Sequence, residues 1–183
     1  MKASHSNGKE HVNMKDPALN GAFARLRAGD KSALAEIYTS LRVPVYTVAL
    51  RILRERSAAE DVTQEVFLKL LDAPPDASVR DPRSWIFRVT RNCAVDAWRR
   101  THTVPLDEQA ETAGEDETAQ TLLKLDLRSA MSLLPADQRE ILAMHLNAGL
   151  TFRVIAGILG LSVPNTYRKY RDAIRRLQSM LRA

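Results

Sequence analysis

The chain has 183 residues, of which 45% are hydrophobic and only 5% aromatic, and its formal net charge is +5. This length suits one ordinary domain or two small ones, and the low aromatic content favours an aliphatic, helical core. No apolar run reaches about 18 residues, the length that a membrane-spanning helix needs. Cys93 is the only cysteine, which excludes internal disulfides and multi-cysteine zinc sites. Residues 1–17 are polar and lack the apolar segment of a secretory signal, so we expect a disordered tail and a cytoplasmic protein.

The basic and acidic residues are unevenly distributed along the chain. Two basic blocks, with net charges of +5 over residues 1–100 and +6 over residues 127–183, flank a segment of net charge −6. The central run PLDEQAETAGEDETA is acidic and poor in apolar residues, which is typical of a linker. Such asymmetry favours a nucleic-acid partner for the basic blocks. We predict a helical domain over residues 18–102, a flexible acidic linker over 103–119 and a second helical domain over 120–183.

Helical periodicity dominates the first predicted domain, and no alternating strand pattern appears. We expect one helix after the sequence RAGD and a second helix from about Pro44 to Arg54. Ser57 and Glu60 have the spacing of a capping box, which predicts that Ser57 precedes the next helix. The prolines in APPDASVRDPR must end that helix, because they remove donors and clash with the preceding turn. A further helix is predicted over SWIFRVTRNCAVDAWRR.

The segment from Thr151 to Leu177 has the layout of a helix-turn-helix. Thr151 and Ser162 are suited to precede two helices, and Gly160 can adopt the positive φ of the turn between them. The second helix has a stripe of mostly apolar residues at spacings of three and four, which we expect to pack inward. This stripe comprises Val163, Thr166, Tyr170, Ala173, Leu177 and Leu181.

The remaining faces of this second helix are basic. Arginine and lysine can neutralise phosphates, and side chains near the start of a recognition helix can reach base edges in the major groove. The alternative is an ordinary two-helix hairpin with a basic, solvated side. Tyr170 is assigned to the core, whereas Tyr167 can either pack at the edge of the stripe or contact DNA. The candidate DNA contacts are Asn165, Thr166, Tyr167, Arg168, Lys169, Arg171 and Arg175.

The stretch AAEDVTQEVFLKL combines a polar edge with more apolar surface than one helix stripe would bury. It can be a core helix with a solvated face, or it can form an acidic and apolar groove for a partner. Periodicity does not decide between the two. The residues of interest are Asp61, Gln64, Glu65 and Phe67, together with Leu68 and Leu71.

The stretch RSWIFRVTRNCAVDAWRR interleaves basic and aromatic residues. Aromatic rings can stack on unpaired bases while arginines follow the phosphate backbone. The alternative, in which the aromatics are core and the arginines are merely solvated, is preferred for Phe87 and Trp98. The basic face is nevertheless favoured as functional, because the second domain has the same feature.

No catalytic pattern is present. The sequence has no P-loop, no GxSxG and no HExxH motif, and its four histidines are not spaced as metal ligands. We therefore expect a protein that is not an enzyme, with no catalytic residue, no metal site and no cofactor.

These segments, in this order, resemble the bacterial RNA polymerase sigma factors of the extracytoplasmic-function (ECF) group. GDKSALAEIYTSLRVPVYTVALRILRERSAAEDVTQEVFLKL resembles the start of their region 2, and DPRSWIFRVTRNCAVDAWRR resembles its promoter-melting part. LPADQREILAMHLNAGLTFRVIAGILGLSVPNTYRKYRDAIRRL resembles region 4. The resemblance implies an all-α fold, with a region 2 helical bundle and a region 4 helix-turn-helix joined by a flexible acidic linker.

The resemblance also implies partners and site residues. Region 2 would bind RNA polymerase core and the melted minus-ten strand, and region 4 would bind core and read the minus-thirty-five element. The core surfaces belong to the beta and beta-prime subunits, and an anti-sigma factor is an expected partner. Asp61, Gln64, Glu65 and Phe67 are assigned to the polymerase surface. The minus-ten contacts are assigned to Arg83, Trp85, Arg88, Arg91, Asn92, Arg99 and Arg100.

The predicted function is that of an ECF-type sigma factor, which directs promoter recognition, promoter melting and transcription initiation without insertion into a membrane. Two alternatives come from other classes. A free-standing helix-turn-helix regulator would bind DNA without polymerase, and no dimerisation helix is apparent for it. A sigma-like decoy would bind an anti-sigma factor, but it should have lost the arginines of its DNA-binding faces.

Overall fold

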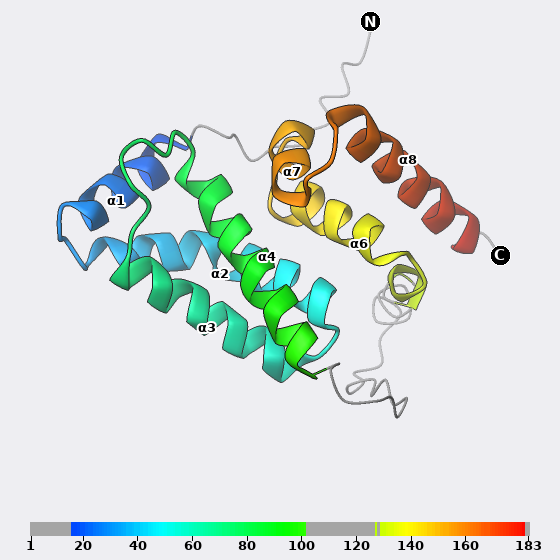
Figure 1. Cartoon of the computed structure of the whole chain (residues 1–183), viewed down its shortest axis with the longest axis horizontal. Helices are drawn as coiled ribbons and strands as arrows, with labels where there is room; N and C mark the ends of the chain where they lie inside the picture. Colours follow the sequence, from blue (N-terminus) through cyan, green and yellow to red (C-terminus); the bar gives the residue numbers. More distant parts are fainter. Residues whose placement is uncertain (1–15, 102–126, 128, 182–183) are drawn as a thin grey trace, which may run out of the picture.

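The computed structural model describes residues 16–101, 127 and 129–181, and these residues form helices and no strand. The prediction of an all-α fold is confirmed. The tail predicted over residues 1–17 lies almost wholly outside the described residues, and the linker predicted over 103–119 lies entirely outside them. The elements, shown in Figure 1, are α1 (Pro17–Arg27), α2 (Ala33–Leu53), α3 (Arg56–Asp72), α4 (Pro82–Thr101), α6 (Ala136–Leu142), the π-helix η1 (Ala143–Asn147), α7 (Phe152–Leu159) and α8 (Val163–Met180), and residues 129–132 are also helical.

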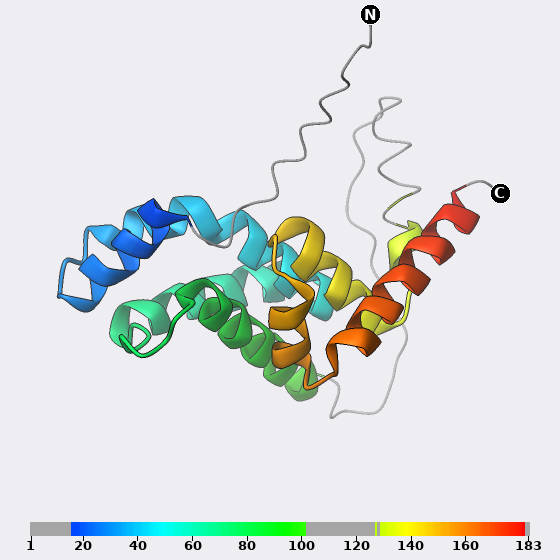
Figure 2. The same cartoon turned by 90° about the horizontal axis from the view of Figure 1, so that it is seen from above.

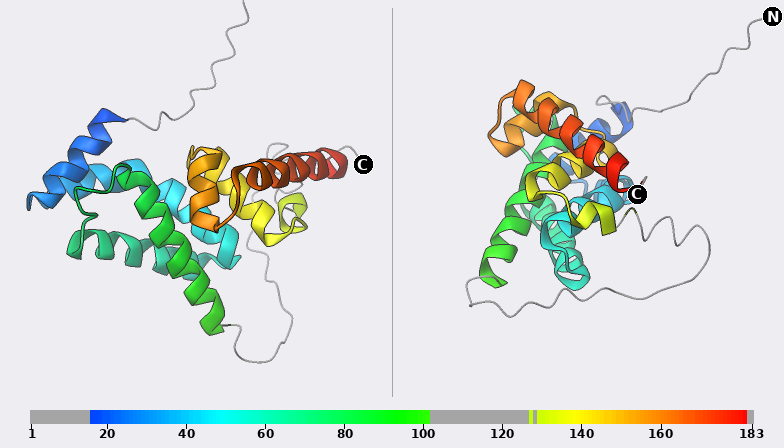
Figure 3. Two further views of the ribbon diagram at one scale, coloured as in Figure 1. Left: turned by 45° about the horizontal axis from the view of Figure 1, so that its top comes forward. Right: turned by 90° about the vertical axis from the view of Figure 1, so that its right-hand side faces the viewer.

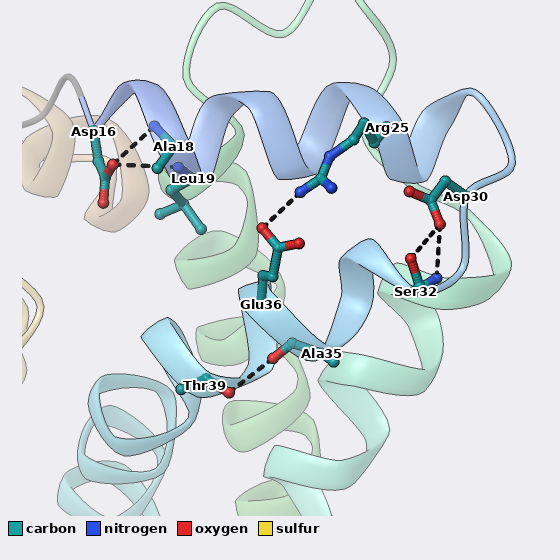
Figure 4. A network of polar contacts seen from close by, with 9 residues as sticks. All are labelled: Asp16, Ala18, Leu19, Arg25, Asp30, Ser32, Ala35, Glu36 and Thr39. Atoms are coloured by element: carbon teal, nitrogen blue, oxygen red, sulfur yellow. Dashed lines mark hydrogen bonds and ion pairs between the residues drawn. The ribbon is translucent and has the colours of Figure 1, made fainter.

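The hairpin of α1 and α2 is fixed by polar contacts at both ends (Figure 4). The Asp16 carboxylate accepts hydrogen bonds from the first amides of α1, at 3.0 Å and 3.2 Å, and so acts as its N-cap. Gly29 has a φ of 95° in the turn, a conformation that a side chain would strain. Across the hairpin, the Arg25 guanidinium lies 2.6 Å from the Glu36 carboxylate. The pair is about half exposed, so it orients the helices more than it stabilises them.

α2 is a single helix of 21 residues, so the prediction of two helices separated before Pro44 is wrong. Pro44 lies inside α2 and removes one backbone donor. The carbonyl that loses its partner belongs to Ser40, which is exposed and can bond to water instead. Buried side chains on both sides of the proline, including Ile37 and Val48, keep the helix packed against its neighbours. Packing therefore overrides the local preference of proline to end a helix.

The start of α3 differs from the predicted capping box. Arg54 adopts a left-handed conformation with a φ of 63°, which ends α2. The Glu55 side chain, and not that of Ser57, then caps α3 by accepting the amides of Ser57 and Ala58 at 2.7 Å and 2.6 Å. Ser57 is already inside the helix, because α3 starts at Arg56 and the Glu55 side chain accepts the first free amides of the helix.

The break between α3 and α4 is confirmed, since residues 73–81 are not helical. Asp81 then starts α4, and its carboxylate accepts the amides of Arg83 and Ser84 at 3.1 Å and 3.2 Å. α4 lies across α2 and α3 (Figure 1) and buries Ile86 and Phe87 completely. The prediction that Phe87 belongs to the core is confirmed. Trp98 is 43% exposed, so its assignment to the core is wrong.

The caps and the turn of the predicted helix-turn-helix are confirmed. The Thr151 hydroxyl accepts the amide of Val154 at the start of α7, and Gly160 has a φ of 67° in the turn. The Ser162 hydroxyl accepts the amide of Asn165 at the start of α8. The stripe of α8 packs inward only along its middle. Thr166, Ala173 and Leu177 are buried and Tyr170 is partly buried, whereas Val163 and Leu181 at the two ends are exposed.

The helices form two units, which we call the N-terminal unit (α1–α4) and the C-terminal unit (residues 129–132, α6, η1, α7 and α8). One continuous hydrophobic core joins them, with Ile37 and Ile86 from the first unit and Met144 and Ile155 from the second, each fully buried. η1 and α6 pack on α2, and α7 packs on α4 (Figures 2 and 3). A smaller core lies within the C-terminal unit, under α8. Among the described residues, no helix is long and apolar enough to cross a membrane.

Candidate nucleic-acid interface

The outward-facing residues of α8 form a basic stripe along one side of the helix. Residues 164, 168, 171 and 175 are exposed at spacings of four, three and four, which places them on the side opposite the buried residues. Three of these four residues are arginines. α8 also lies at the edge of the molecule, and none of the other described helices covers its outer side (Figures 1 and 3). α8 therefore presents arginines to any ligand that approaches from outside.

The first turns of α8 are fixed by an aromatic cluster that the sequence pattern did not predict. Phe152 at the start of α7 stacks on the His145 ring, with centroids 4.4 Å apart, and packs edge-on against Tyr167 and Tyr170. His145 is held in turn by a 2.9 Å hydrogen bond between its Nδ1 and the carbonyl of Leu150. Tyr170 is partly buried within this cluster, as predicted. Tyr167 packs on Phe152, which supports the interpretation of edge packing, and it is still 47% exposed, so its contact with DNA stays a prediction.

Several polar residues of α8 already have partners. Lys169 lies 2.5 Å from the Asp137 carboxylate of α6, and its side chain is only 29% exposed. Its assignment as a freely available phosphate contact needs correction, because Asp137 neutralises it. Arg168 donates to the Asn165 side chain at 2.9 Å, and both groups remain near the start of the helix. Thr166 is fully buried and donates to a backbone carbonyl, so its assignment as a DNA contact is wrong for this conformation.

The Arg171 guanidinium lies 5.9 Å from the centroid of the Tyr167 ring, above its face. Arg175 pairs with Asp172 at 2.9 Å, and its side chain is 67% exposed. Such exposed contacts contribute little free energy and can be exchanged for a phosphate. Arg171 and Arg175 therefore remain available on the outer face of α8.

α4 carries the second basic face. Arg88 and Asn92 are exposed and lie one turn apart on α4. Arg99 and Arg100 are exposed near the end of the helix, where Trp98 is also partly exposed. The structure thus brings arginines and an aromatic ring to the outside of α4. Trp85 is different, because it is only partly exposed and packs against the core.

Arg83 does not belong to this exposed face. It is 7% exposed, and its guanidinium donates to the backbone carbonyl of Ala148 in the C-terminal unit. Burial lowers the pKa of Arg83 below its ordinary value, although the group stays charged. Its assignment as a minus-ten contact is wrong for this conformation, because the C-terminal unit covers it.

Arg91 is also covered by the C-terminal unit. Its Nε lies 2.8 Å from Oε2 of Glu140 on α6, and the two side chains are 28% and 10% exposed. The residues are 49 positions apart in the sequence. Arg91 can therefore reach a nucleic acid only after it leaves Glu140.

The outer face of α3 combines polar and apolar residues. Asp61, Gln64 and Leu68 lie on one stripe and are exposed, and Leu68 is 60% exposed. Phe67 is only 5% exposed and packs edge-on against Tyr38 of α2, with centroids 4.8 Å apart. Its assignment to a partner surface is wrong for direct contact, because it lies in the core. Leu68 is the large apolar side chain that is exposed on this face.

Glu65 lies beside this face and is held by neighbours. Its carboxylate is 2.6 Å from the Lys69 ammonium, and this ion pair lowers the pKa of Glu65. The Lys69 ammonium also lies 3.2 Å from the sulfur of Cys93, which is buried. Burial raises the pKa of Cys93, so the thiol stays protonated. The cluster ties α3 to α4. In the part of the chain that the structure describes, no three His, Cys, Asp or Glu side chains gather as metal ligands.

Models of known protein families match both units of this chain. The model of sigma-70 region 2 matches residues 37–103, and the model of sigma-70 region 4 matches residues 124–177. The first match covers most of the N-terminal unit, and the second covers the C-terminal unit up to Leu177. The two basic faces on α4 and α8 therefore fall in different matched regions.

Two curated proteins are similar to this chain over most of its length. A probable RNA polymerase sigma factor, RfaY of Xanthomonas campestris, is 31% identical over 172 residues, which cover 83% of this chain and 41% of RfaY. The chain thus spans less than half the length of that relative. The ECF RNA polymerase sigma factor SigK of Mycobacterium ulcerans is 25% identical over 176 residues, which cover 90% of this chain and 94% of SigK.

Two solved structures share the fold. CnrH in complex with the cytosolic domain of CnrY has a TM-score of 0.68 and 21% identity, and the match covers 90% of this chain and 97% of that chain. The sigma factor RpoE of Bartonella quintana, in complex with the anti-sigma factor NepR, has a TM-score of 0.61 and 20% identity. That match covers 81% of this chain and 96% of that chain.

Proposed function

Because this chain belongs to the ECF group of sigma-70 RNA polymerase sigma factors, we propose that it binds RNA polymerase core and directs it to promoters. In this function the N-terminal unit is region 2 and the C-terminal unit is region 4. The observation that carries the proposal is the presence of two separate basic helix faces, on α4 and α8, in one chain. A free-standing helix-turn-helix regulator would need only the second face, and a decoy would need neither.

The C-terminal unit would place α8 in the major groove at the minus-thirty-five element. The first turns of a recognition helix reach base edges, and these turns expose Tyr167 and Arg168. Arg168 is oriented by Asn165, and a good bidentate contact contributes about 1–3 kcal/mol of discrimination between bases. Arg171 and Arg175 lie further along the same face and would bind phosphates.

The N-terminal unit would hold the melted minus-ten strand along α4. An unpaired base costs a few kcal/mol to remove from its stack, and stacking and phosphate contacts must offset that cost. Arg88 and Asn92 offer polar groups, and the partly exposed ring of Trp98 offers a stacking surface near Arg99 and Arg100. The protein itself carries out no bond-making chemistry in this role.

The face of Asp61, Gln64 and Leu68 on α3 would bind the polymerase core. An exposed leucine beside acidic and amide groups suits a partner helix that has apolar and basic residues. This role would place the protein in the cytoplasm with the polymerase. An anti-sigma factor would compete for the same surfaces, and the complex of Bartonella quintana RpoE with NepR gives a precedent in a protein of this fold.

Binding measurements separate this proposal from its alternatives. The purified chain is titrated against RNA polymerase core, and against promoter DNA with and without core. A sigma factor binds core tightly and recognises promoter DNA mainly when core is present. Sequence-specific DNA binding that is independent of core would support a free-standing regulator. Failure to bind core would contradict the proposal.

A further inference from the structure

The start of α8 carries apolar side chains on its surface, whereas exposed arginines follow further along the helix. Val163 is 42% exposed and Tyr167 is 47% exposed, and Pro164 beside them is also exposed. The sequence pattern assigned Val163 to the inward stripe, and the structure leaves it outside. Val163, Tyr167 and Arg171 follow one another four positions apart, so they form one ridge along the helix. We call Val163, Pro164 and Tyr167 the apolar edge of α8.

The ring of Tyr167 has a fixed orientation within this apolar edge. Phe152 of α7 contacts it edge-on, with ring centroids 5.3 Å apart, and the Arg171 guanidinium lies over its face, 5.9 Å from the centroid. The Ser162 hydroxyl accepts the amide of Asn165 and so fixes the first turn of the helix. Side chains that are already ordered lose little conformational entropy when they bind. The apolar edge is therefore preorganised for a ligand.

The position of the apolar edge along α8 decides which ligand it can meet. In the proposed function, on which this inference rests, α8 lies in the major groove and its first turns reach the base edges. Arg168 and Arg171 lie beside the apolar edge, and their charge complements the phosphates of a DNA duplex. The apolar group that the major groove presents is the C5-methyl group of thymine. Cytosine that is methylated at C5 carries the same group at the same place.

We propose that the apolar edge of α8 reads the C5-methyl group of a pyrimidine in the minus-thirty-five element, with Val163 and Tyr167 as the specificity-determining residues. Arg168 reads a neighbouring base, and Arg171 binds a phosphate while its guanidinium stays over the Tyr167 ring. Tyr167 thus couples a base contact to a phosphate contact. Thymine supplies the methyl group in unmodified DNA, and 5-methylcytosine supplies it in methylated DNA.

Removal of single methyl groups from the DNA tests this proposal. The full chain is combined with RNA polymerase core and bound to a promoter that it transcribes, and each thymine of the minus-thirty-five element is replaced in turn by uracil, which lacks only the methyl group. We expect one or two replacements to weaken binding about fourfold, the factor that corresponds to about 0.8 kcal/mol for one buried carbon.

A second set of promoters distinguishes the two sources of the methyl group. Each cytosine of the minus-thirty-five element is replaced in turn by 5-methylcytosine. Sensitivity to uracil assigns the methyl group to thymine. A gain of about fourfold on methylation of a cytosine, with every thymine insensitive, assigns it to 5-methylcytosine. Binding that responds to neither replacement at any position would overturn the proposal.

Protein variants assign the effect to the apolar edge. Tyr167→Ala should lower the ratio of affinities for methylated and unmethylated DNA from about fourfold to below about twofold, and Val163→Ala should lower it to about twofold. Tyr167→Phe should keep the ratio, because the ring and not the hydroxyl makes the contact. Leu181→Ala is the matched control, since Leu181 is also 47% exposed but lies just beyond the far end of α8. A ratio that is unchanged in both Tyr167→Ala and Val163→Ala would overturn the assignment.

Affinity for RNA polymerase core, measured with the same proteins, separates this inference from the proposed function. Weaker core binding by Val163→Ala, with no sensitivity to the methyl group, would show that the apolar edge contacts the polymerase and would overturn the inference. Normal transcription from the unmodified promoter, again without methyl sensitivity, would overturn the inference alone. Failure of the unchanged protein to bind core or to direct transcription would instead contradict the proposed function.

Discussion

Phe152 at the start of α7 holds the ring of Tyr167 on the recognition helix, with ring centroids 5.3 Å apart and ring planes at 75°. This edge-on contact fixes one side of the tyrosine, and the Arg171 guanidinium lies over its face. The first helix of the helix-turn-helix thus orients two residues of the second. The surface that would meet the major groove is built by both helices.

Phe152→Ala should therefore alter DNA recognition although Phe152 itself lies behind the DNA-facing side. Without the phenyl ring, Tyr167 and Arg171 lose a fixed orientation, and aromatic pairs contribute about 0.5–1.5 kcal/mol beyond their buried area. We expect weaker discrimination among minus-thirty-five sequences and a modest loss of stability. Selection of promoter variants by the holoenzyme measures the first effect. An unchanged sequence preference in Phe152→Ala, with Tyr167→Ala still altering it, would contradict this account.

Arg168 and Arg175 should differ in what they contribute to promoter binding. Arg168→Ala should relax preference at one or two upstream positions, because Arg168 lies near the start of α8 where base edges are reached. Arg175→Ala should weaken binding to all sequences and reduce the salt slope by about one. Lys169→Ala is the control, and Asp137 already neutralises it, so its effect on the slope should be smaller. Equal effects of Arg168→Ala and Arg175→Ala on every promoter would show that the division is wrong.

The outer face of α3 gives a prediction about core binding. Leu68→Glu should weaken binding to polymerase core at least tenfold and leave the fold intact, because Leu68 is 60% exposed. Phe67→Ala should instead cost about 3–5 kcal/mol of folding stability, since its ring is buried against Tyr38. Val43→Glu on α2, at a residue 61% exposed, is the control and should change neither property. Affinity for core and urea unfolding distinguish the three variants.

The Glu55 cap of α3 gives a pH prediction. Hydrogen bonds from the Ala58 and Ser57 amides lower the pKa of Glu55 in the folded chain. Its contribution to stability is therefore present above the unfolded pKa of about 4.3, and it is lost as pH falls through the folded pKa. Glu55→Gln should reduce stability at neutral pH and flatten the loss of stability on acidification. Thermal unfolding at a series of pH values tests this, and an unchanged pH profile would contradict the capping role.

Features of the fold that depend only on residues close together in the sequence could be predicted from the sequence alone. Thr151, Gly160 and Ser162 cap and turn the helix-turn-helix as expected, because caps and positive φ angles are local properties. The prediction of a helix boundary before Pro44 was wrong, since packing on both sides of Pro44 outweighs the local cost of one lost hydrogen-bond donor. Glu55 was missed as a cap, because glutamate is not among the preferred N-cap residues.

The candidate site was predicted less completely than the fold. Residues of α8 and α4 were located because basic residues recur along one helix face. The covering of Arg83 and Arg91 could not be found, because their partners lie 65 and 49 positions away in the other unit. Phe67 and Leu68 are adjacent in the sequence, and only the packing of Tyr38 shows which of them is buried. Long-range packing thus decides which candidates remain accessible.

Run-off transcription with purified RNA polymerase core tests the central claim most directly. Core is incubated with a promoter library, with and without this protein, and the start sites and promoter sequences of the transcripts are determined. The account predicts protein-dependent transcripts from a restricted set of promoters, lost when Arg88 and Asn92 are both replaced by alanine. Transcription that is the same with and without the protein, under conditions in which core and protein associate, would contradict it.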